Sequence, residues 1–378
     1  THAYTGGVAR HIDDMAAMLA ARGLGVVLLA PRRGAGDGRV GVNLREAIDV
    51  PNLGDLDVEA DFDDLVAALR TLRVRQIHVH SLVEWPDAAL ERLPDLAEAL
   101  GVPLDFTFHD YLPVCPRINM IDDTGVFCGV HGWRACNACE NRDRQPAGAP
   151  DIDVWRERYR RFVGRARHLY APSVDTAARL ACYFPDRTIR VMPHDEPPPP
   201  AEPAAVVRAP GERLRVVLIG AIGPHKGSAL FLAMAEDAAA RALPLDFVLV
   251  GHSDVDGVLG GLATVTGAYR EEEVDALLAA QRCHVALIPS LWPETYCYTL
   301  SIALRNGFPV AVFDLGAQRE RLVATAPDRA IVLPLSAMTD APAVNDLLLA
   351  GAERFVGVPP RRAASAAAAH TFDSYYGT

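Results

Sequence analysis

The 378-residue sequence lacks long apolar runs and a surplus of basic residues. No apolar run approaches the ~20 residues that a membrane-spanning helix needs, so we expect no transmembrane segment. The formal net charge is −11, whereas a nucleic-acid partner requires a basic surface, so nucleic acid is not expected as a partner. No signal peptide is visible, and an odd number of cysteines, seven, does not suggest a secreted disulfide framework. These absences favour a cytoplasmic location, including a peripheral one at the inner face of the membrane.

Two familiar nucleotide-binding signatures are also missing. Neither half of the chain has G-x-G-x-x-G at its first strand–helix turn, which argues against a nicotinamide-dependent enzyme. The turn that contains Lys226 lacks the G-x-x-x-x-G-K-[ST] spacing of a Walker loop. The sequence has no starting methionine and stops abruptly, and we expect it to be part of a longer polypeptide with further domains.

Short apolar runs alternate with helix-period segments along the chain, which is the pattern of parallel sheets covered by helices. The sequence therefore predicts an α/β fold of two Rossmann-like, doubly wound domains. Expected strands lie at residues 26–30, 76–80, 104–108, 168–171, 189–192, 214–219, 246–250, 284–288 and 310–313. Expected helices contain Val8 to Leu19, Phe62 to Leu69 and Trp155 to Val163, follow Lys226 and Glu271, and cover residues 296–305 and 344–355, with an Ala-rich stretch to Ala369 as a further candidate.

Four consecutive prolines at residues 197–200 give the best domain boundary, because such a run continues neither a helix nor a central strand. We expect an N-terminal domain over residues 1–196, with a Cys-rich insertion at 115–144. A Pro-rich linker follows at 197–210, and a C-terminal domain covers 211–378, whose last part after about Ser365 is a candidate to cross back. Ligands of doubly wound sheets bind at the carboxyl ends of the strands, so we expect a cleft between the two domains.

Two glycine-containing turns precede predicted helices. Gly6 and Gly7 open the first helix, where a backbone can approach an anion, although a plain tight turn fits equally well. In the second half, an apolar strand runs into the turn that contains Gly220, Gly223, Lys226 and Gly227. A lysine at the mouth of a strand–turn–helix unit can meet a phosphate, and the alternative is a solvated lysine at a helix start.

Glu294 follows the predicted strand 284–288 and precedes the predicted helix 296–305. A carboxylate at this rim of a sheet can accept hydrogen bonds from sugar hydroxyls. The alternative is an ordinary glutamate in the first turn of a helix, where the helix dipole stabilises it.

An ordered set of segments resembles the retaining GT-B glycosyltransferases of the family-4 type, which act in bacterial polysaccharide and glycan biosynthesis. In the second half these are Gly220 to Gly227, residues 266–269 (TGAY), residues 289–294 (PSLWPE) and residues 307–310 (GFPV). The first half adds residues 6–11 (GGVARH), 108–110 (FHD) and 171–173 (APS). The resemblance covers nearly the whole chain and implies the GT-B fold, a nucleotide-sugar donor and transfer of a hexosyl-type sugar to a hydroxyl of a glycan or lipid-linked acceptor.

The resemblance also implies roles for individual residues. The glycine pair and the lysine contact the donor diphosphate, the histidine of the His-Asp pair faces the transferred sugar, and the first glutamate contacts the same sugar. His109 and Glu294 are accordingly the candidate catalytic residues, and we expect them to meet across the cleft. The candidate donor-binding residues are Gly6, Gly7, Gly223, Lys226, Gly227, Tyr269, Tyr296, Cys297, Tyr298 and Thr299.

Two positions depart from the family pattern. Ile302 stands where the second glutamate of Glu-(seven residues)-Glu would bind ribose, and Ala221 stands where an arginine usually follows the first glycine. Other groups compensate, or the donor contacts are unusual, or activity is lost. No catalytic metal is required when the protein itself neutralises the diphosphate. Asp254 and Asp256 match the Asp-x-Asp cation spacing, but their place in a loop favours coincidence.

Four of the seven cysteines fall in one irregular segment: Cys115, Cys128, Cys136 and Cys139. Thiolates at this spacing can hold a structural tetrahedral zinc ion, and a long irregular segment needs a local organiser. Free buried thiols and disulfides are the alternatives. Cys182, Cys283 and Cys297 are interpreted as small buried hydrophobic residues.

Three functional classes remain open. The first is an active nucleotide-sugar-dependent glycosyltransferase. The second is a catalytically degenerate GT-B-like domain that binds a glycan or nucleotide without turnover, which Ile302 and Ala221 favour modestly. The third is another GT-B enzyme, such as a nucleotide-sugar epimerase or hydrolase.

Overall fold

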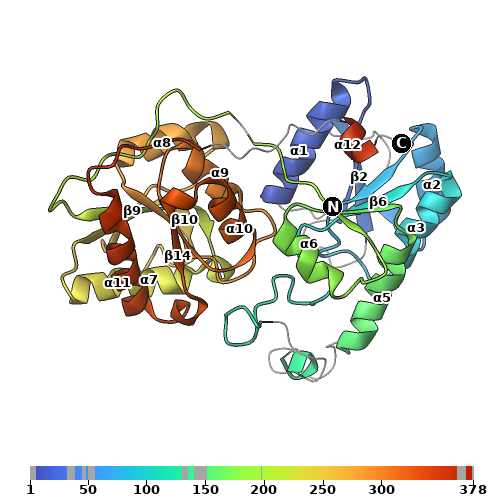
Figure 1. The fold of residues 1–378 in the computed structure, drawn as a ribbon. Coiled ribbons are helices and arrows are strands. Elements are labelled where there is room, and N and C mark those ends of the chain that lie inside the picture. Colours follow the sequence, from blue (N-terminus) through green and yellow to red (C-terminus); the bar gives the residue numbers. More distant parts are fainter. Residues whose placement is uncertain are drawn as a thin grey trace. The chain divides into compact units, whose positions relative to one another are not determined.

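The computed structural model describes residues 6–31, 39–44, 48–49, 56–129, 135–139, 151–196, 198–363 and 372–376. The chain divides into two compact units (Figure 1). The first contains Thr1–Ile118, His131–Asp195 and Ala368–Thr378, and the second contains Asn119–Val130 and Glu196–Ala367. Within the described ranges, no helix has both the length and the apolar character to cross a bilayer.

The first unit contains a four-stranded parallel sheet in the order β5–β6–β7–β8. Its strands are β5 (Ile77–Val79), β6 (Leu104–Thr107), β7 (His168–Ala171) and β8 (Ile189–Val191). The helices are α1 (Gly7–Ala20), α2 (Phe62–Thr71), α3 (Ala89–Leu100), α5 (Ile152–Arg165), α6 (Val174–Ala181) and α12 (Phe372–Tyr376). Asp151 and Ser173 cap α5 and α6 by accepting backbone N–H bonds, which fixes where these helices begin.

The strand predicted at residues 26–30 forms, but it is not the buried strand that the apolar run at these positions predicts. β1 (Val27–Pro31) is mostly half-buried, because it pairs antiparallel with β2 (Arg39–Leu44) in a separate sheet. β3 (Ile48–Asp49) and β4 (Leu56–Asp57) complete that sheet by pairing with β2. None of these three partner strands was predicted.

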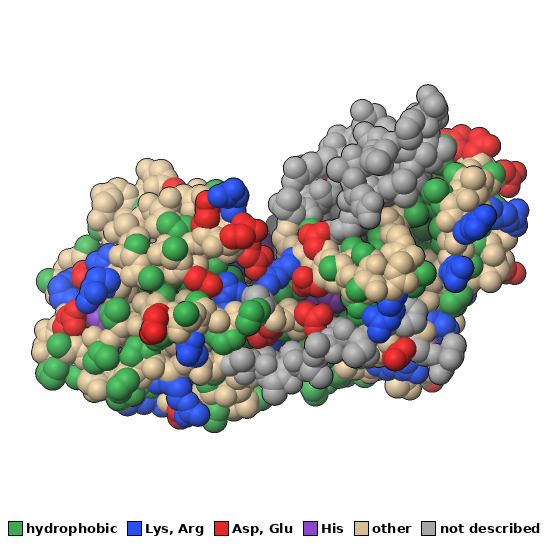
Figure 2. Space-filling view, turned by 90° about the horizontal axis from the view of Figure 1, so that it is seen from above, with side chains coloured by type: hydrophobic (Ala, Val, Ile, Leu, Met, Phe, Trp, Pro, Cys, Tyr) green, Lys and Arg blue, Asp and Glu red, His purple; other side chains and the backbone are tan. Residues whose placement is uncertain are grey.

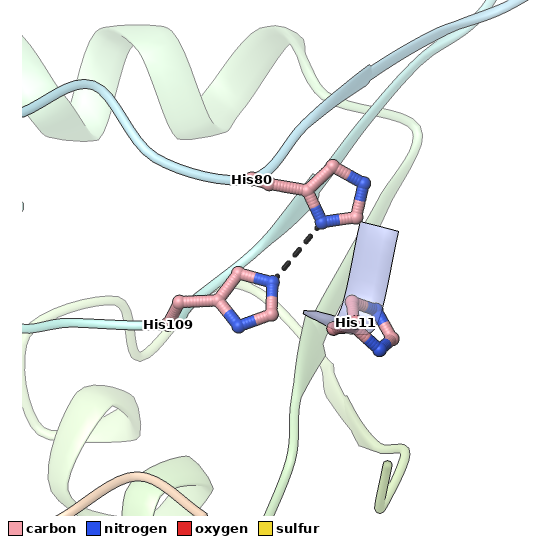
Figure 3. A group of neighbouring side chains, drawn as sticks. All are labelled: His11, His80 and His109. Atoms are coloured by element: carbon pink, nitrogen blue, oxygen red, sulfur yellow. Dashed lines mark hydrogen bonds between the residues drawn. The ribbon is translucent and has the colours of Figure 1, made fainter. Parts of the chain in front are cut away.

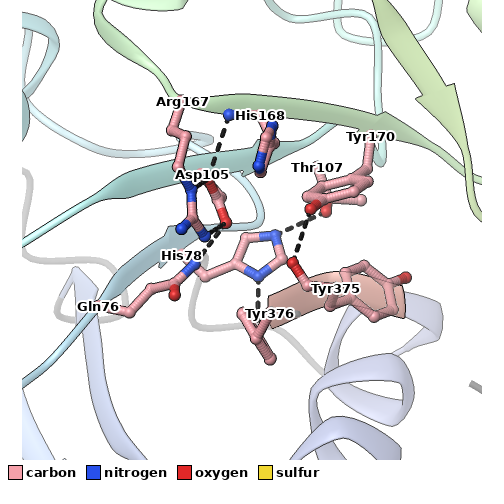
Figure 4. A network of polar contacts seen from close by, with 9 residues as sticks. All are labelled: Gln76, His78, Asp105, Thr107, Arg167, His168, Tyr170, Tyr375 and Tyr376. Atoms are coloured by element: carbon pink, nitrogen blue, oxygen red, sulfur yellow. Dashed lines mark hydrogen bonds and ion pairs between the residues drawn. The ribbon is translucent and has the colours of Figure 1, made fainter. Parts of the chain in front are cut away.

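The C-terminal helix α12 belongs to the first unit, beside α1 (Figure 1). Tyr375 of α12 packs with Met15 of α1 and Tyr170 of β7. The Tyr170 hydroxyl donates to the Tyr375 carbonyl at 2.8 Å, and His78 Nδ1 lies 2.9 Å from the Tyr376 hydroxyl (Figure 4). The end of the chain therefore crosses back to the first unit, as considered for the segment after about Ser365, and lies outside the C-terminal domain to which residues 211–378 were assigned.

The second unit is a six-stranded, fully parallel sheet in the order β11–β10–β9–β12–β13–β14. Its strands are β9 (Leu214–Ile222), β10 (Leu245–Ser253), β11 (Ala263–Val265), β12 (Val285–Ile288), β13 (Val310–Phe313) and β14 (Ala330–Leu333). The helices are α7 (Ser228–Ala240), α8 (Val274–Gln281), α9 (Tyr298–Arg305), α10 (Gly316–Thr325) and α11 (Ala341–Ala352). Short 3-10 turns occur at Pro224–Lys226, Glu271–Glu273, Pro327–Arg329, Leu335–Ala337 and Glu353–Phe355.

Successive side chains of β9 point alternately to the two faces of this sheet, and helices cover both faces. Val216 and Leu218 pack with α7 and α11 in one core, and Val217 and Ile219 pack with α8, α9 and α10 in the other. Full burial of such a side chain contributes roughly 1.5–3 kcal/mol, so a strand that faces two cores carries an uninterrupted apolar run. The four strands predicted in this half are confirmed, whereas β11 and β14 were not predicted.

The boundary between the units falls between Asp195 and Glu196, beside the predicted boundary at 196. Two segments lie elsewhere than predicted. Residues 198–210 belong to the second unit, where Ala204 and Ala205 join its core, instead of forming a separate linker; Pro197 and the Ala-rich residues 364–371 lie outside the described residues. Asn119–Val130 also joins the second unit, because the Phe127 N–H donates to the Leu291 carbonyl at 3.1 Å.

Charged side chains of both signs are interspersed on the face shown in Figure 2. No extended basic stripe appears on this face among the described residues, which agrees with the net charge of −11.

Candidate functional site

The carboxyl ends of β9 and β12 mark the point where the strand order of the second unit reverses. From β9 the chain adds β10 and β11 on one side, and it then returns to add β12, β13 and β14 on the other. Ligands of open α/β sheets bind at such switch points, because two neighbouring connections leave the sheet in opposite directions. The two predicted donor segments, Gly220 to Gly227 and Pro289 to Thr299, begin at these two strand ends.

The turn after β9 needs glycine at a position of close approach. Gly227 has φ 84°, and a Cβ there would lie 2.3 Å from the Pro289 carbonyl oxygen. Gly227 thus lets the turn pack directly on the backbone of the segment that follows β12. Gly223 accepts the Lys226 and Ser228 N–H groups at 2.9 and 3.2 Å, which closes the turn immediately before α7.

Lys226 is the only lysine in the sequence, beside 36 arginines. It lies half-buried at the end of the 3-10 turn Pro224–Lys226. No other described residue forms an ion pair or a side-chain hydrogen bond with its ammonium group. A cation at the end of a strand, with no partner in the described part of its unit, can meet the phosphates of a ligand.

Glu294 lies in the loop between β12 and α9, with a side chain only 6 % exposed. α9 begins at Tyr298 and has no acidic residue in its first turn. The alternative interpretation of Glu294 as a first-turn glutamate is therefore wrong. The Ser290 hydroxyl donates to Glu294 Oε1, and the Ala317 N–H donates to the Glu294 carbonyl at 2.9 Å, so the loop holds the carboxylate in place.

Other predicted donor residues surround the same strand ends. A Cβ on Gly220 would lie 3.8 Å from Thr299 Oγ1 and 3.9 Å from the Tyr269 hydroxyl, so all three converge. Burial raises the pKa of Tyr269 to about 12, which keeps its hydroxyl protonated as a donor. Cys297 is the left-handed residue that precedes α9, and burial, followed by the Glu294 charge, raises the pKa of its thiol.

The rings of Tyr296 and Tyr298 lie edge to face with centroids 5.0 Å apart. Tyr298 starts α9, and the Tyr296 carbonyl accepts a hydrogen bond from Arg321 at 2.7 Å. The predicted residues from Glu294 to Thr299 thus follow one another along the loop after β12 and into the first turn of α9.

Sequence reasoning missed a carboxylate that contacts Tyr296. Tyr296 and Ser301 donate their hydroxyls to Glu196 Oε1 at 2.7 and 2.6 Å, and Arg321 pairs with the same oxygen. The Arg321 guanidinium also lies 3.8 Å from the centre of the Tyr296 ring. Glu196 lies 98 residues before Glu294 and beside a proline run, so no spacing signal could have linked the two.

Ile302, in the position of the expected ribose-binding glutamate, is a core residue of the second unit. Its side chain is 7 % exposed and packs with the β12, β13 and α8 core. Asp256, from the Asp-x-Asp pair, accepts bonds from the Ser253 N–H and hydroxyl at 2.9 and 2.6 Å. This carboxylate forms hydrogen bonds within its own turn, which agrees with the interpretation of the spacing as coincidence.

In the first unit, Gly6 and Gly7 lie at the start of α1, as predicted. Gly6 precedes the helix with φ 137°, and no side chain caps the helix there. A glycine is needed for this backbone conformation, and the helix N-terminus offers amide groups to an anion.

His109 follows β6 and is 7 % exposed. Its Nε2 atom shares a hydrogen bond of 3.0 Å with Nδ1 of His80, and His11 of α1 completes a cluster with them (Figure 3). Burial, followed by the neighbouring histidines, lowers the pKa of His80 well below its usual value, so that ring is neutral at pH 7. Only His109 of the three was a predicted site residue.

Asp110 fixes the loop that carries His109. Its carboxylate accepts bonds from the Ser81 hydroxyl and the Leu112 N–H, both at 2.9 Å. Burial raises the pKa of Asp110 to about 6. The meeting of His109 and Glu294 across a cleft stays a prediction.

The four clustered cysteines are all half-buried. Cys115, Cys136 and Cys139 belong to the first unit and Cys128 to the second. Among the described residues, the group of three or more potential ligands whose atoms lie within 4.8 Å of one another is His11, His80 and His109, and it includes no cysteine. The structural zinc at the four cysteines stays a prediction.

Solved glycosyltransferase structures share this fold. Sucrose-phosphate synthase from Thermosynechococcus elongatus is similar with a TM-score of 0.57 and 16% identity, over 95% of this chain and 91% of that one. A glycosyltransferase from Rickettsia africae ESF-5 has a TM-score of 0.56 and 10% identity, over 93% and 86% of the two chains. The pneumococcal O-GlcNAc transferase GtfA, in complex with UDP and GlcNAc, has a TM-score of 0.51 and 12% identity, over 88% and 62%.

The two parallel-sheet α/β units are thus those of GT-B glycosyltransferases, as the sequence predicted. Comparison with curated protein sequences found no match. The profile of Glycosyltransferase Family 4 matches residues 5–194, just over half of the chain. The protein therefore belongs to Glycosyltransferase Family 4.

Proposed function

We propose that this protein transfers a hexosyl-type sugar from a nucleotide-sugar donor to a hydroxyl group of a glycan or lipid-linked acceptor, with retention of anomeric configuration. One observation carries the proposal: the only lysine of the chain lies at the strand end where a nucleotide diphosphate would bind. Every other Lys or Arg position of the chain is an arginine, and the one compact ammonium group lies there, where both it and the Glu294 carboxylate act on the Cys297 thiol.

Transfer breaks the bond between the anomeric carbon and the donor diphosphate and forms a bond from that carbon to the acceptor oxygen. The hydroxyl proton passes to the departing diphosphate. Lys226 and the backbone amides at the start of α1 would stabilise the charge that develops on the diphosphate, which is electrostatic preorganisation. This arrangement needs no catalytic metal ion.

Glu294 would accept hydrogen bonds from hydroxyls of the transferred sugar, and His109 would hydrogen-bond the same sugar from the first unit. The loop contacts from Ser290 and Ala317 already fix the Glu294 carboxylate, so little ordering remains when a sugar binds. Bacterial glycan biosynthesis in the cytoplasm, at the inner face of the membrane, is the setting that this function suits.

The alternative is a degenerate domain that binds a nucleotide or glycan without turnover. The core position of Ile302 and the alanine at position 221 favour it, because both remove donor contacts of the family pattern. Glu196 favours an active enzyme over a binding domain, since it supplies a carboxylate beside Ser301, the residue before Ile302.

A screen of nucleoside diphosphate sugars, with and without acceptor glycans, tests the proposal. Transfer gives a new glycoside, whose anomeric configuration proton NMR determines, together with free nucleoside diphosphate. Donor binding without product for any acceptor would support the binding domain instead. Release of free sugar alone would identify a hydrolase, and a changed donor sugar would identify an epimerase.

A further inference from the structure

Three histidines from three separate elements of the first unit point into one small volume (Figure 3). His11 comes from α1, His80 follows β5 and His109 follows β6. The side chains are 1, 7 and 7 % exposed, and one nitrogen from each lies within 4.8 Å of the other two. Sequence separations of 69 and 29 residues exclude local chain geometry as the reason for their meeting.

The spacing of these rings matches that of imidazoles around one tetrahedral metal ion. Zinc–nitrogen bonds of about 2.0–2.1 Å place the ring centroids about 3.2 Å from the ion and therefore about 5.3 Å from one another. The three observed centroid separations are 5.4, 5.1 and 5.3 Å. Tetrahedral ligand nitrogens lie about 3.3 Å apart. The His80 and His109 nitrogens lie 3.0 Å apart, so this pair needs a movement of only a few tenths of an ångström, and a nitrogen of His11 lies within 4.8 Å of both.

A neighbouring histidine packs against the His80 ring. His78 stacks on His80 with centroids 4.2 Å apart, and its own nitrogens bond to Thr107 and Tyr376 at 2.8 and 2.9 Å. Packing that fixes ligand rings is a regular feature of metal sites. The cluster includes no carboxylate, so its donor set suits ions that prefer imidazole, such as zinc and nickel, over magnesium and calcium.

We propose that His11, His80 and His109 bind one divalent transition-metal ion, such as Zn²⁺ or Ni²⁺. The site is separate from the candidate cysteine site and does not depend on glycosyl transfer. The dashed contact in Figure 3 joins His109 Nε2 to His80, so coordination would use this nitrogen and the proposed sugar contact would use the other ring nitrogen. Metal binding and the proposed sugar contact thus use different atoms of His109.

The test uses chelator-treated protein without a polyhistidine tag, titrated with Ni²⁺ and separately with Zn²⁺ in a calorimeter. The double variant His11→Gln/His80→Gln removes two ligands and keeps His109. Its matched control is His168→Gln, which removes a histidine outside the cluster on the same sheet. Cys136→Ser/Cys139→Ser removes the cysteine site, so a zinc ion there does not confuse the count.

On the Cys136→Ser/Cys139→Ser background, we expect the protein to bind one Ni²⁺ ion, His168→Gln to leave its affinity unchanged, and His11→Gln/His80→Gln to weaken it at least about 100-fold. X-ray absorption of the loaded Cys136→Ser/Cys139→Ser variant is expected to show nitrogen ligands and no sulfur. Absence of Ni²⁺ binding, sulfur ligation, or undiminished binding by the double variant would overturn the proposal. If the double variant does not fold, the single variants His11→Gln and His80→Gln take its place with the same expected loss.

Discussion

Replacement of Lys226 by alanine is the sharpest perturbation of the proposed donor site. The ammonium group is half-buried at the end of the Pro224–Lys226 turn, and no described side chain neutralises it. A charge-assisted hydrogen bond to a diphosphate stabilises a complex by about 1.5–3 kcal/mol. Its loss is expected to weaken nucleoside diphosphate binding roughly 10- to 150-fold, since each 1.4 kcal/mol is a factor of ten.

Isothermal titration of the wild type with UDP, ADP and GDP first identifies the nucleotide that it prefers. Titration of Lys226→Ala with that nucleotide then measures the loss of affinity. Lys226→Arg keeps a charge at the same place and is expected to lose less affinity. Arg361→Ala is the matched control, because it removes one exposed positive charge of the second unit after α11. An unchanged dissociation constant in folded Lys226→Ala protein would remove this lysine from the site.

Four further predictions follow from other residues. Glu294→Gln is expected to cut sugar transfer roughly 100-fold or more in folded protein; wild-type rates for both this variant and His109→Ala would refute the catalytic assignment. Glu196→Gln is expected to reduce the free energy of unfolding by about 1–3 kcal/mol in a urea titration, since Arg321 loses its charged partner, and an unchanged midpoint would show that the pair contributes nothing. Cys182 is exposed, so its interpretation as a buried residue is wrong. Alkylation at about pH 8 is expected to label Cys182 and to spare Cys283, whose pKa burial raises to about 11, so that about 0.1 % is thiolate; equal labelling in peptide maps would contradict this. When both proteins are purified without added metal, the Cys136→Ser variant is expected to contain about one zinc ion per chain fewer than the wild type. A zinc content that this substitution leaves unchanged would reject the cysteine site.

The fold of the second unit could be predicted from the sequence because its strands face two cores. β9 and β13 carry uninterrupted apolar runs, and such runs between helix-period segments leave little alternative to a covered parallel sheet. β11 escaped prediction because it has three residues of half-buried or exposed character. β2 and β3 escaped because they pair in a separate antiparallel sheet that the strand–helix alternation does not indicate.

Some residues of the candidate site could likewise be predicted from the sequence, and others could not. Lys226 and Glu294 lie directly after or near strand ends, so local sequence order places them at the edge of the sheet. Glu196 and His11 reach their clusters through long-range packing, and their sequence neighbours carry no sign of it. The helix predicted from residue 296 begins at Tyr298, because Cys297 takes a left-handed conformation that no residue type there would suggest.

The accessibility of Lys226 tests most directly the claim that its turn holds a nucleotide-sugar donor. Because the chain has one lysine, an amine-specific acylating reagent gives one side-chain product, which mass spectrometry separates from acylation of the chain terminus. The acylation rate of Lys226 is expected to fall at least tenfold at saturating concentrations of the donor that the screen identifies, and to stay unchanged with the free sugar alone. An acylation rate that no nucleoside diphosphate or nucleotide sugar changes would contradict the account.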